Sequence, residues 1–379
     1  MKSCRVLVVD DSLVYRTAVA RALEGMPSVE KVYLASDPFE ARDQIEQWEP
    51  DVMVLDVEMP KMNGIVFLQK LLPQYPIPVI VMSTAPDYVF EALECGAVDF
   101  IAKPSIGNGQ NMSSFLRELS LKIPSAFSAG VGRTSVASRN NGGNDGGDSR
   151  KSGLGEKGIY ADGAPVLRAS AAAGKAESAG SASSSNYKVI AIGASTGGTE
   201  AVLALLKDIP AQGSPGIVIV IHMPPGFTKS YAERLNNKTG LTVKEAVSGD
   251  VVKPGQVLVS PGGKHMMLSR QGNDLVVDCR VGRKVSGHCP SVDVLFDSVA
   301  RSAGNSGIGV LLTGMGNDGA LGLLHMRNAG ARTLGQDEAS SVVYGMPRVA
   351  LEIGAVERQA GIMRMGAVIR TLVRGDIKS

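Results

Sequence analysis

The stretch Lys-Val-Ile-Ala-Ile-Gly-Ala-Ser-Thr-Gly-Gly-Thr, residues 188–199, joins a short apolar run to a glycine-rich turn. The apolar run is typical of a buried parallel strand, and an amphipathic helical pattern follows the turn. Strand, turn and helix in this order predict an open α/β sheet with its site at the carboxyl ends of the strands. Ser195 lies on the turn and fits the G-x-S-x-G pattern of an exposed nucleophile. An anion-binding turn at a helix N-terminus fits the same residues.

The composition indicates globular domains without an obvious nucleic-acid or membrane partner. The chain has 379 residues, of which 44% are hydrophobic, and a net charge of +2, which suggests two or three domains. The cysteines form no C-x-x-C pair, so neither a zinc site nor a disulfide framework is indicated, and a reduced, cytoplasmic setting fits better. The N-terminus does not resemble a signal peptide, and no apolar run approaches the ~20 residues of a membrane span.

Residues 1–122 alternate strand and helix patterns. The pattern predicts a five-stranded, doubly wound parallel sheet. The expected strands are 6–9, 32–35, 52–55, 78–82 and 98–102, and the expected helices are 13–23, 39–47, 64–72, 88–94 and 113–122.

Polar side chains follow the strands of this predicted sheet. Asp10 and Asp11 follow the first strand, Asp56 the third, Ser83 the fourth and Lys103 the fifth. Three acids held together repel one another, and a Mg²⁺ ion relieves that repulsion. The set predicts a phosphoryl-accepting pocket, in which Asp56 attacks phosphorus while Lys103 and Ser83 bind phosphate oxygens. Taken singly, an N-capping aspartate or a solvated lysine would be an ordinary structural residue.

This segment resembles the response-regulator receiver domain. The resemblance is carried by Val-Val-Asp-Asp-Ser (8–12), Val-Leu-Asp-Val-Glu-Met-Pro-Lys-Met-Asn-Gly (54–64), Met-Ser-Thr-Ala (82–85) and Phe-Ile-Ala-Lys-Pro (100–104). It implies Asp56 as phosphoacceptor, Asp10 and Asp11 as further metal-site acids, Ser83 as the switch hydroxyl and Lys103 as the phosphate-contacting lysine. Phe100 occupies the family's aromatic switch position, although a core phenylalanine would fit as well.

Residues 123–186 are rich in Gly, Ser, Ala and Asn, from Pro124 onward. Such a segment buries too little apolar surface to offset its ordering entropy, so we expect a flexible linker. A random coil of roughly 64 residues reaches roughly 45 Å, which lets two flanking domains dock or separate.

Residues 187–379 again alternate strands and helices. We expect mostly parallel α/β structure, with strands at 216–221 and 308–312, a Pro-led helix at 290–300 and a small antiparallel excursion near 257–278. Three polar residues follow strands here: Ser195, His222 and Asp318. A serine nucleophile needs a base, and an imidazole base needs an acidic orienter.

The other histidines are weaker candidates for the base. His325 lies within an amphipathic helix, His265 on the expected hairpin and His288 in a loop before Pro290. His222 is therefore the expected base. Asp318 is the expected orienter, although an N-cap for the helix at Ala320 explains it equally well.

At these residues the chain resembles the chemotaxis protein-glutamate methylesterase family, CheB. The matching segments are 192–199, 221–228, 261–266, 290–296, 312–320 and 336–347. The resemblance implies Ser195 as nucleophile, His222 as base and Asp318 as orienter, with no cofactor in this domain. It also implies a substrate, the glutamate γ-methyl esters of methyl-accepting chemoreceptors, together with deamidation of certain glutamines, and a chemotaxis-type histidine kinase as phosphodonor. The linker is longer than the short hinge usual in the family.

Two further expectations concern the oxyanion and control. Amides of Thr196 and Met315 are candidates for the oxyanion hole. The unphosphorylated receiver is expected to obstruct the Ser195 cleft until Asp56 is phosphorylated. Two alternatives remain open: a nucleotide-binding switch, although G-x-G-x-x-G is not matched, and a non-enzymatic regulator, although no DNA-binding pattern is present.

Overall fold

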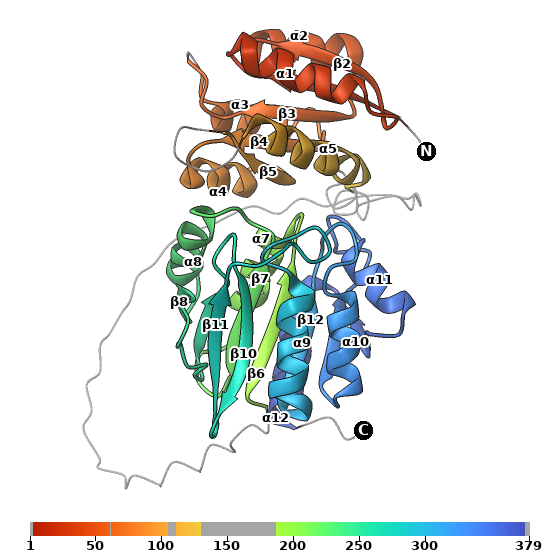
Figure 1. The fold of residues 1–379 in the computed structure, drawn as a ribbon. Helices are drawn as coiled ribbons and strands as arrows, with labels where there is room; N and C mark the ends of the chain where they lie inside the picture. The colour runs from red at the N-terminus through yellow and green to blue at the C-terminus, as the bar shows by residue number, and fades with distance from the viewer. Residues whose placement is uncertain (1–2, 61, 105–110, 130–186, 376–379) are drawn as a thin grey trace, which may run out of the picture. The chain divides into compact units, whose positions relative to one another are not determined.

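The computed structural model describes residues 3–60, 62–104, 111–129 and 187–375 (Figure 1). These residues form two α/β domains, each built on a parallel sheet. Most of the expected linker, residues 130–186, lies outside the described residues.

The N-terminal domain has a five-stranded parallel sheet in the order β2-β1-β3-β4-β5 among the residues described. This is the expected doubly wound arrangement, in which the first strand lies inside the sheet and helices cover both faces. Its elements are β1 (Cys4–Val9), α1 (Leu13–Glu24), β2 (Val29–Ala35), α2 (Pro38–Trp48), β3 (Val52–Asp56), α3 (Gly64–Leu71), β4 (Val79–Ser83), α4 (Pro86–Glu94), β5 (Asp99–Ala102) and α5 (Met112–Ser128).

Helix α5 extends beyond the expected end of the first domain. It continues through Pro124 to Ser128, whereas the sequence pattern placed the start of the linker at residue 123. A proline inside a helix removes one backbone hydrogen bond. Here Ile123 and Ala126 are fully buried on either side of it, so packing outweighs that loss.

The C-terminal domain has a seven-stranded sheet in the order β14-β13-β12-β6-β7-β9-β8, and every pairing in it is parallel over the described residues. Its strands are β6 (Val189–Ala194), β7 (Gly216–Ile221), β8 (Thr242–Glu245), β9 (Gln256–Val259), β12 (Gly307–Leu311), β13 (Arg332–Gln336) and β14 (Arg358–Ala360), and its helical segments are α7 (Gly198–Lys207), α8 (Phe227–Lys238), α9 (Val292–Ser302), η1 (Gly304–Ser306), α10 (Ala320–Asn328), α11 (Met346–Glu352) and α12 (Ile362–Arg374).

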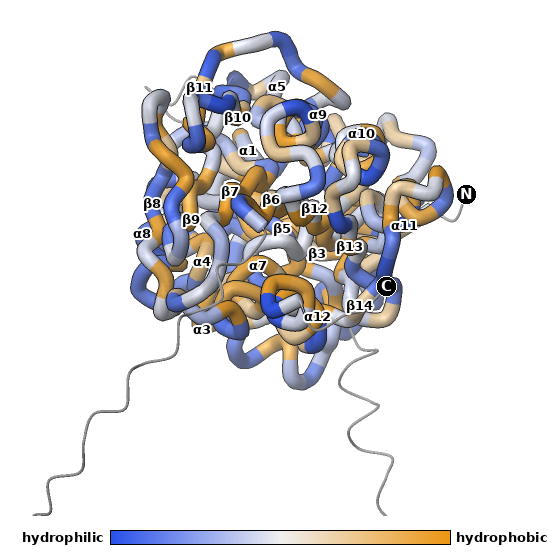
Figure 2. Tube along the Cα trace, turned by 90° about the horizontal axis from the view of Figure 1, so that it is seen from below, coloured by the Kyte–Doolittle hydropathy of each residue, from blue (hydrophilic) through white to orange (hydrophobic). Residues whose placement is uncertain are grey.

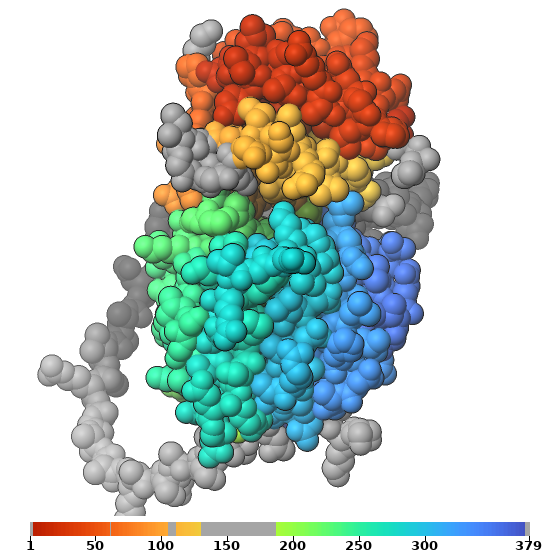
Figure 3. All heavy atoms as spheres, viewed as in Figure 1, coloured from red at the N-terminus to blue at the C-terminus, as the bar shows by residue number. Residues whose placement is uncertain are grey.

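The antiparallel part is a separate hairpin of β10 (His265–Gln271) and β11 (Asp274–Arg280). The expected excursion near 257–278 was therefore placed too early, because β9 belongs to the main parallel sheet. On the surface of this domain the hairpin lies next to α9 (Figure 3).

The central strands are buried on both faces, which explains their continuous apolar sequences. On β6, Val189 and Ala191 pack toward α9 and α10, whereas Ile190 and Ile192 pack toward α7, α8 and α12. Figure 2 shows hydrophobic residues concentrated along these central strands. A sheet covered in this way leaves only the ends of its strands open to solvent. Of the helices described, none is both long and apolar enough to cross a bilayer.

Gly193 on β6 packs directly against Val292 at the start of α9. A Cβ on this residue would lie 2.2 Å from Val292 Cγ1. We therefore predict that Gly193→Ala lowers the free energy of unfolding by about 1–3 kcal/mol, because α9 has to move away from the strand. Chemical denaturation followed by circular dichroism tests this.

The matched control is Gly240→Ala, since an added Cβ there meets no atom within 4 Å. It should leave the unfolding midpoint close to that of the wild type. Equal destabilisation by the two substitutions would contradict the prediction.

Candidate active site

Three neighbouring strands of the C-terminal sheet deliver the expected catalytic residues to one point. Ser195 follows β6, His222 follows β7, and Asp318 lies in the loop after β12. Backbone hydrogen bonds continue the sheet into these loops, from Ser195 N to Thr313 O (3.0 Å) and from His222 N to Ala194 O (3.3 Å). The positions of the serine and the histidine are thus fixed by the sheet itself.

The three side chains form a continuous hydrogen-bonded chain. Ser195 Oγ lies 3.0 Å from His222 Nδ1, and His222 Nε2 lies 2.8 Å from Asp318 Oδ2. The ring nitrogens have exchanged partners relative to the serine-protease arrangement, in which Nε2 faces the serine and Nδ1 the aspartate. The chemical roles are unaffected, because either ring nitrogen can accept a proton while the other donates to the carboxylate.

Asp318 is buried at the N-terminus of α9. Besides His222, its carboxylate accepts hydrogen bonds from Ser291 Oγ (2.7 Å) and from the backbone amides of Val292 (2.8 Å) and Asp293 (3.1 Å). Free amides and the helix dipole both favour a negative charge at this position. The alternative role of Asp318, as N-cap of α10, does not occur, because Gly319 occupies that position without a side-chain cap.

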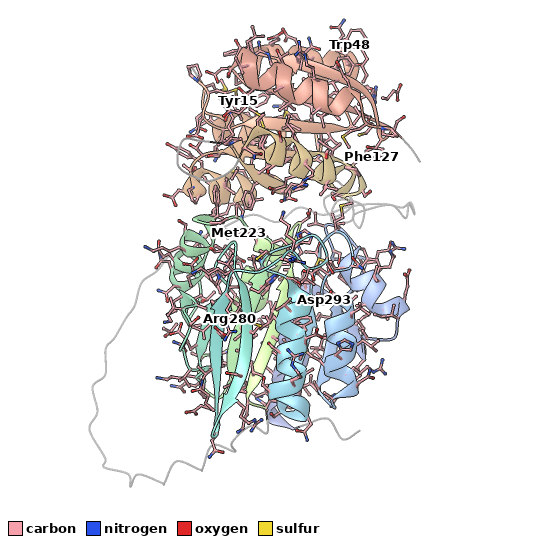
Figure 4. All side chains as sticks on the ribbon, viewed as in Figure 1. Tyr15, Trp48, Phe127, Met223, Arg280 and Asp293 are labelled. Carbon is pink, nitrogen blue, oxygen red and sulfur yellow. The ribbon has the colours of Figure 1, made fainter. Side chains whose placement is uncertain are left out.

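The surroundings keep the Asp318 carboxylate ionised. Burial alone would raise its pKa, but the hydrogen bond and charge of His222, together with the bonds from Ser291 and Val292, lower it to about 2. Asp293, on the first turn of α9 (Figure 4), has its pKa shifted in the opposite direction, upward. Burial and the nearby Asp318 raise the pKa of Asp293, although its bond from Gly322 N opposes this.

The remaining histidines have distinct positions. His288 stacks on His222, with ring centroids 3.6 Å apart and ring planes 5° apart. His265 is buried; its Nε2 bonds Arg283 O (2.8 Å) and its Nδ1 accepts from Ser291 N (3.2 Å). His325 is exposed on α10 and pairs with Asp297 (2.6 Å).

Of the expected oxyanion residues, Thr196 directly follows Ser195 and Met315 directly follows Gly314. Gly314 lies against Ser195, since a Cβ on Gly314 would be 2.7 Å from Ser195 Cβ. Within the described residues, the amides of Thr196 and Met315 donate to no protein acceptor, whereas the Ser195 amide is bonded to Thr313 O. Both expected oxyanion amides are thus left without a protein acceptor among the described residues.

The second predicted site lies in the N-terminal domain. Asp10, Asp11 and Asp56 each offer a carboxylate oxygen within 4.8 Å of the others, an all-oxygen donor set that suits Mg²⁺. Lys103 Nζ lies 2.8 Å from Asp10 Oδ2 and 2.7 Å from Asp56 Oδ2. Burial raises the pKa of Asp56, and the charge of Lys103 only partly opposes this. For Lys103, burial favours the neutral amine, but the two carboxylates outweigh it and raise its pKa.

Ser83 and Phe100 lie on adjacent strands of that domain. Ser83 Oγ is 3.1 Å from Glu58 Oε2 and accepts a bond from Ala85 N (3.0 Å). Phe100 is buried and stacks on Phe227, with ring centroids 5.4 Å apart. The residues predicted for the phosphoryl site therefore all lie at the carboxyl ends of β1, β3, β4 and β5. Phe100 lies within β5, next to β4.

The hydrogen bonds that Asp318 accepts at the start of α9 were not predicted from the sequence. Ser291 was included only as part of a Pro-led helix, although a serine directly before an apolar helical pattern is a typical N-cap. The stacking of His288 on His222 had no sequence signal, because the two residues are far apart along the chain. Met223, labelled in Figure 4, directly follows His222 and is buried in the core.

Comparison with known proteins identifies both domains. The family model described as CheB methylesterase matches residues 190–369, and that of the response regulator receiver domain matches residues 6–112. A protein of Syntrophomonas wolfei named "Protein-glutamate methylesterase/protein-glutamine glutaminase 2" is 47% identical over 98% of both chains. A Pseudomonas aeruginosa protein of the same name is 44% identical, over 96% of this chain and 95% of its own.

Among solved structures, the Thermotoga maritima CheB methylesterase catalytic domain covers 49% of this chain and 99% of its own, with 36% identity and a TM-score of 0.48. The two full-length relatives align over both domains at once and not over either one alone. The chain belongs to the family of CheB methylesterases that carry an N-terminal response-regulator receiver domain.

Proposed function

We propose that this protein hydrolyses glutamate γ-methyl esters, and deamidates specific glutamines, on the cytoplasmic helices of chemoreceptors, under control of phosphorylation at Asp56. The hydrogen-bonded chain from Ser195 through His222 to Asp318 is the observation that carries the proposal. The names of the full-length relatives supply the substrate class.

In this reaction Ser195 Oγ attacks the γ-carbonyl carbon and His222 Nδ1 takes the hydroxyl proton. The tetrahedral intermediate collapses when His222 returns that proton to the leaving group, which departs as methanol from an ester or ammonia from an amide. Water then attacks the acyl-enzyme with the same base, releasing glutamate and free Ser195. Asp318 holds the imidazole and stabilises its positive charge.

The amides of Thr196 and Met315 are the proposed donors to the oxyanion. Their lack of a protein acceptor among the described residues supports this role, because a preorganised donor lowers the barrier only if it is free to bind the developing charge.

In the receiver domain, Asp56 is the proposed phosphoacceptor. Its Oδ attacks the phosphorus of a donor, the histidine of a kinase or a small acyl phosphate, and the donor leaves. Asp10, Asp11 and Asp56 would hold Mg²⁺, which supplies positive charge for the phosphate oxygens. Lys103 would bind another phosphate oxygen, and Ser83 would leave Glu58 to do the same.

Contacts between the two domains support a gating role for the receiver. The described parts of residues 1–132 and 184–379 form one compact unit. Thr196 Oγ1, next to the nucleophile, donates to Asp99 Oδ2 on β5 (2.6 Å), and Phe100 stacks on Phe227. A receiver held beside Thr196 would obstruct the approach of a helical substrate to Ser195. Phosphorylation opens the site tenfold if it weakens docking by about 1.4 kcal/mol.

The triad predicts graded losses of activity. Ser195→Ala and His222→Ala should each lower the rate of methanol release from methylated receptor by at least about 10³-fold, because nucleophile or base is lost. Asp318→Asn should keep a weaker activity, since the base remains but loses its charged orienter. Thermal unfolding provides the folding control. A Ser195→Ala protein that is folded and keeps more than a few per cent of the wild-type rate would rule the mechanism out.

The gating proposal predicts opposite effects of two changes. A chain lacking the whole receiver domain, to the end of α5 at Ser128, should have a higher basal rate than the full-length protein, because the receiver no longer obstructs the site. Asp56→Asn should keep the low basal rate but lose stimulation by a small phosphodonor with Mg²⁺. Rates on methylated receptor that are equal for full-length, truncated and phosphodonor-treated protein would leave the receiver without a gating role.

A further inference from the structure

The turn at 285–288 packs against the triad a side chain that its chemistry does not use, that of His288. Val285 and His288 exchange both backbone hydrogen bonds (3.0 and 2.9 Å), and Ser286 and Gly287 have positive φ angles of 51° and 85°. Positive φ at both central residues is typical of a type I′ turn, a common two-residue connection. The turn places the ring of His288 flat against the ring of His222, at 3.6 Å.

This turn is fastened to the body of the domain at two further points. Ser286 Oγ bonds Asp293 Oδ2 (3.1 Å), and the carbonyl of Arg283 is bonded by the buried His265 (2.8 Å). His265 also accepts a hydrogen bond from Ser291 N. Asp293 also accepts one from Gly322 N. Residues 280–287 are exposed in spite of this, so the fastening holds one ring in place without burying the loop.

The stacked arrangement requires at least one of the two rings to be neutral, because two imidazolium ions in contact would repel each other. Burial, followed by the charge of His222, lowers the pKa of His288 to about 3. His288 therefore stays uncharged when His222 takes the serine proton. A neutral aromatic face is a favourable neighbour for a cation, and it blocks rotation of the ring away from Ser195.

We propose that His288 is a positioning residue, whose neutral ring fixes the plane of His222 so that Nδ1 faces Ser195 while Nε2 faces Asp318. The proposal rests on the triad mechanism above, and it assigns His288 no proton transfer and no contact with substrate. Small displacements of a catalytic group cost up to about 10²-fold in rate, and the loss of this packing surface permits such a displacement.

Two variants separate the stacking surface from the volume of the side chain. His288→Leu fills the space without an aromatic plane, whereas His288→Phe keeps the plane and removes both nitrogens. In the full-length protein with saturating phosphodonor, we expect His288→Leu to lower kcat for methanol release about 10–100-fold, with KM within about twofold of the wild type. His288→Phe should stay within about threefold of the wild-type kcat.

His325→Leu is the matched control, because His325 is exposed on α10 and remote from the triad chain; it should leave both constants unchanged. A His288→Phe protein as slow as His288→Leu would overturn the proposal, since a nitrogen of His288 would then be required. A raised KM at constant kcat would also overturn it and make His288 a substrate contact.

A second measurement does not depend on the substrate. The Nε2–H proton of His222, shared with Asp318, should give a slowly exchanging downfield NMR signal in wild type and His288→Phe, and should be lost in His288→Leu. If the signal is kept in wild type and His288→Phe and lost in His288→Leu, but no methanol is released from receptor, the proposed substrate is wrong and the positioning role stands. If His288→Leu keeps the signal and the full kcat, the positioning role fails while the proposed function stands.

Discussion

The C-terminal domain depends on the burial of one negative charge. A carboxylate taken out of water is costly unless hydrogen bonds replace its hydration, and Asp318 receives such bonds from Ser291, Val292, Asp293 and His222. Three of these donors come from the start of α9, so the helix and the catalytic base are held by the same group. The close packing of α9 on β6 at Gly193 fixes the distance at which this happens. A shift of α9 relative to β6 would therefore also move Asp318 and, through it, the His222 ring.

Much of the fold and the central residues of the site could be predicted from the sequence. Continuous apolar runs such as Ile217–Ile221 identify strands buried on both faces, and parallel strands place whatever follows them at a common edge. From that rule one expects Ser195, His222 and Asp318 to lie close together. The same rule predicts that Asp10, Asp56 and Lys103 lie close together in the other domain. The roles of these residues in catalysis and phosphorylation remain predictions until the variants are measured.

The misplaced details have physical reasons. Pro124 was given too much weight as a helix terminator, because local propensity cannot register the buried packing of Ile123 and Ala126. The strand β9 was assigned to an antiparallel excursion because pairing partners are not encoded in a strand of four residues. The stacking of His288 and the bonds of His265 arise from a long loop folding back, which periodicity does not describe.

The exchanged ring nitrogens of His222 have a geometrical origin with a wider consequence. Ser195 follows the strand next to that of His222, and neighbouring strands are about 4.8 Å apart, so the ring nitrogen nearest the His222 backbone reaches it. Asp318 follows β12, one strand further along the sheet, and is reached by the outer nitrogen. The distance between nucleophile and base is thus set by the spacing of neighbouring strands, and changes in loop sequence affect it little. The acid is carried by loops and a helix end that can vary. Substitutions around Asp318 can therefore change the basicity of His222 while the distance between Ser195 and His222 stays the same.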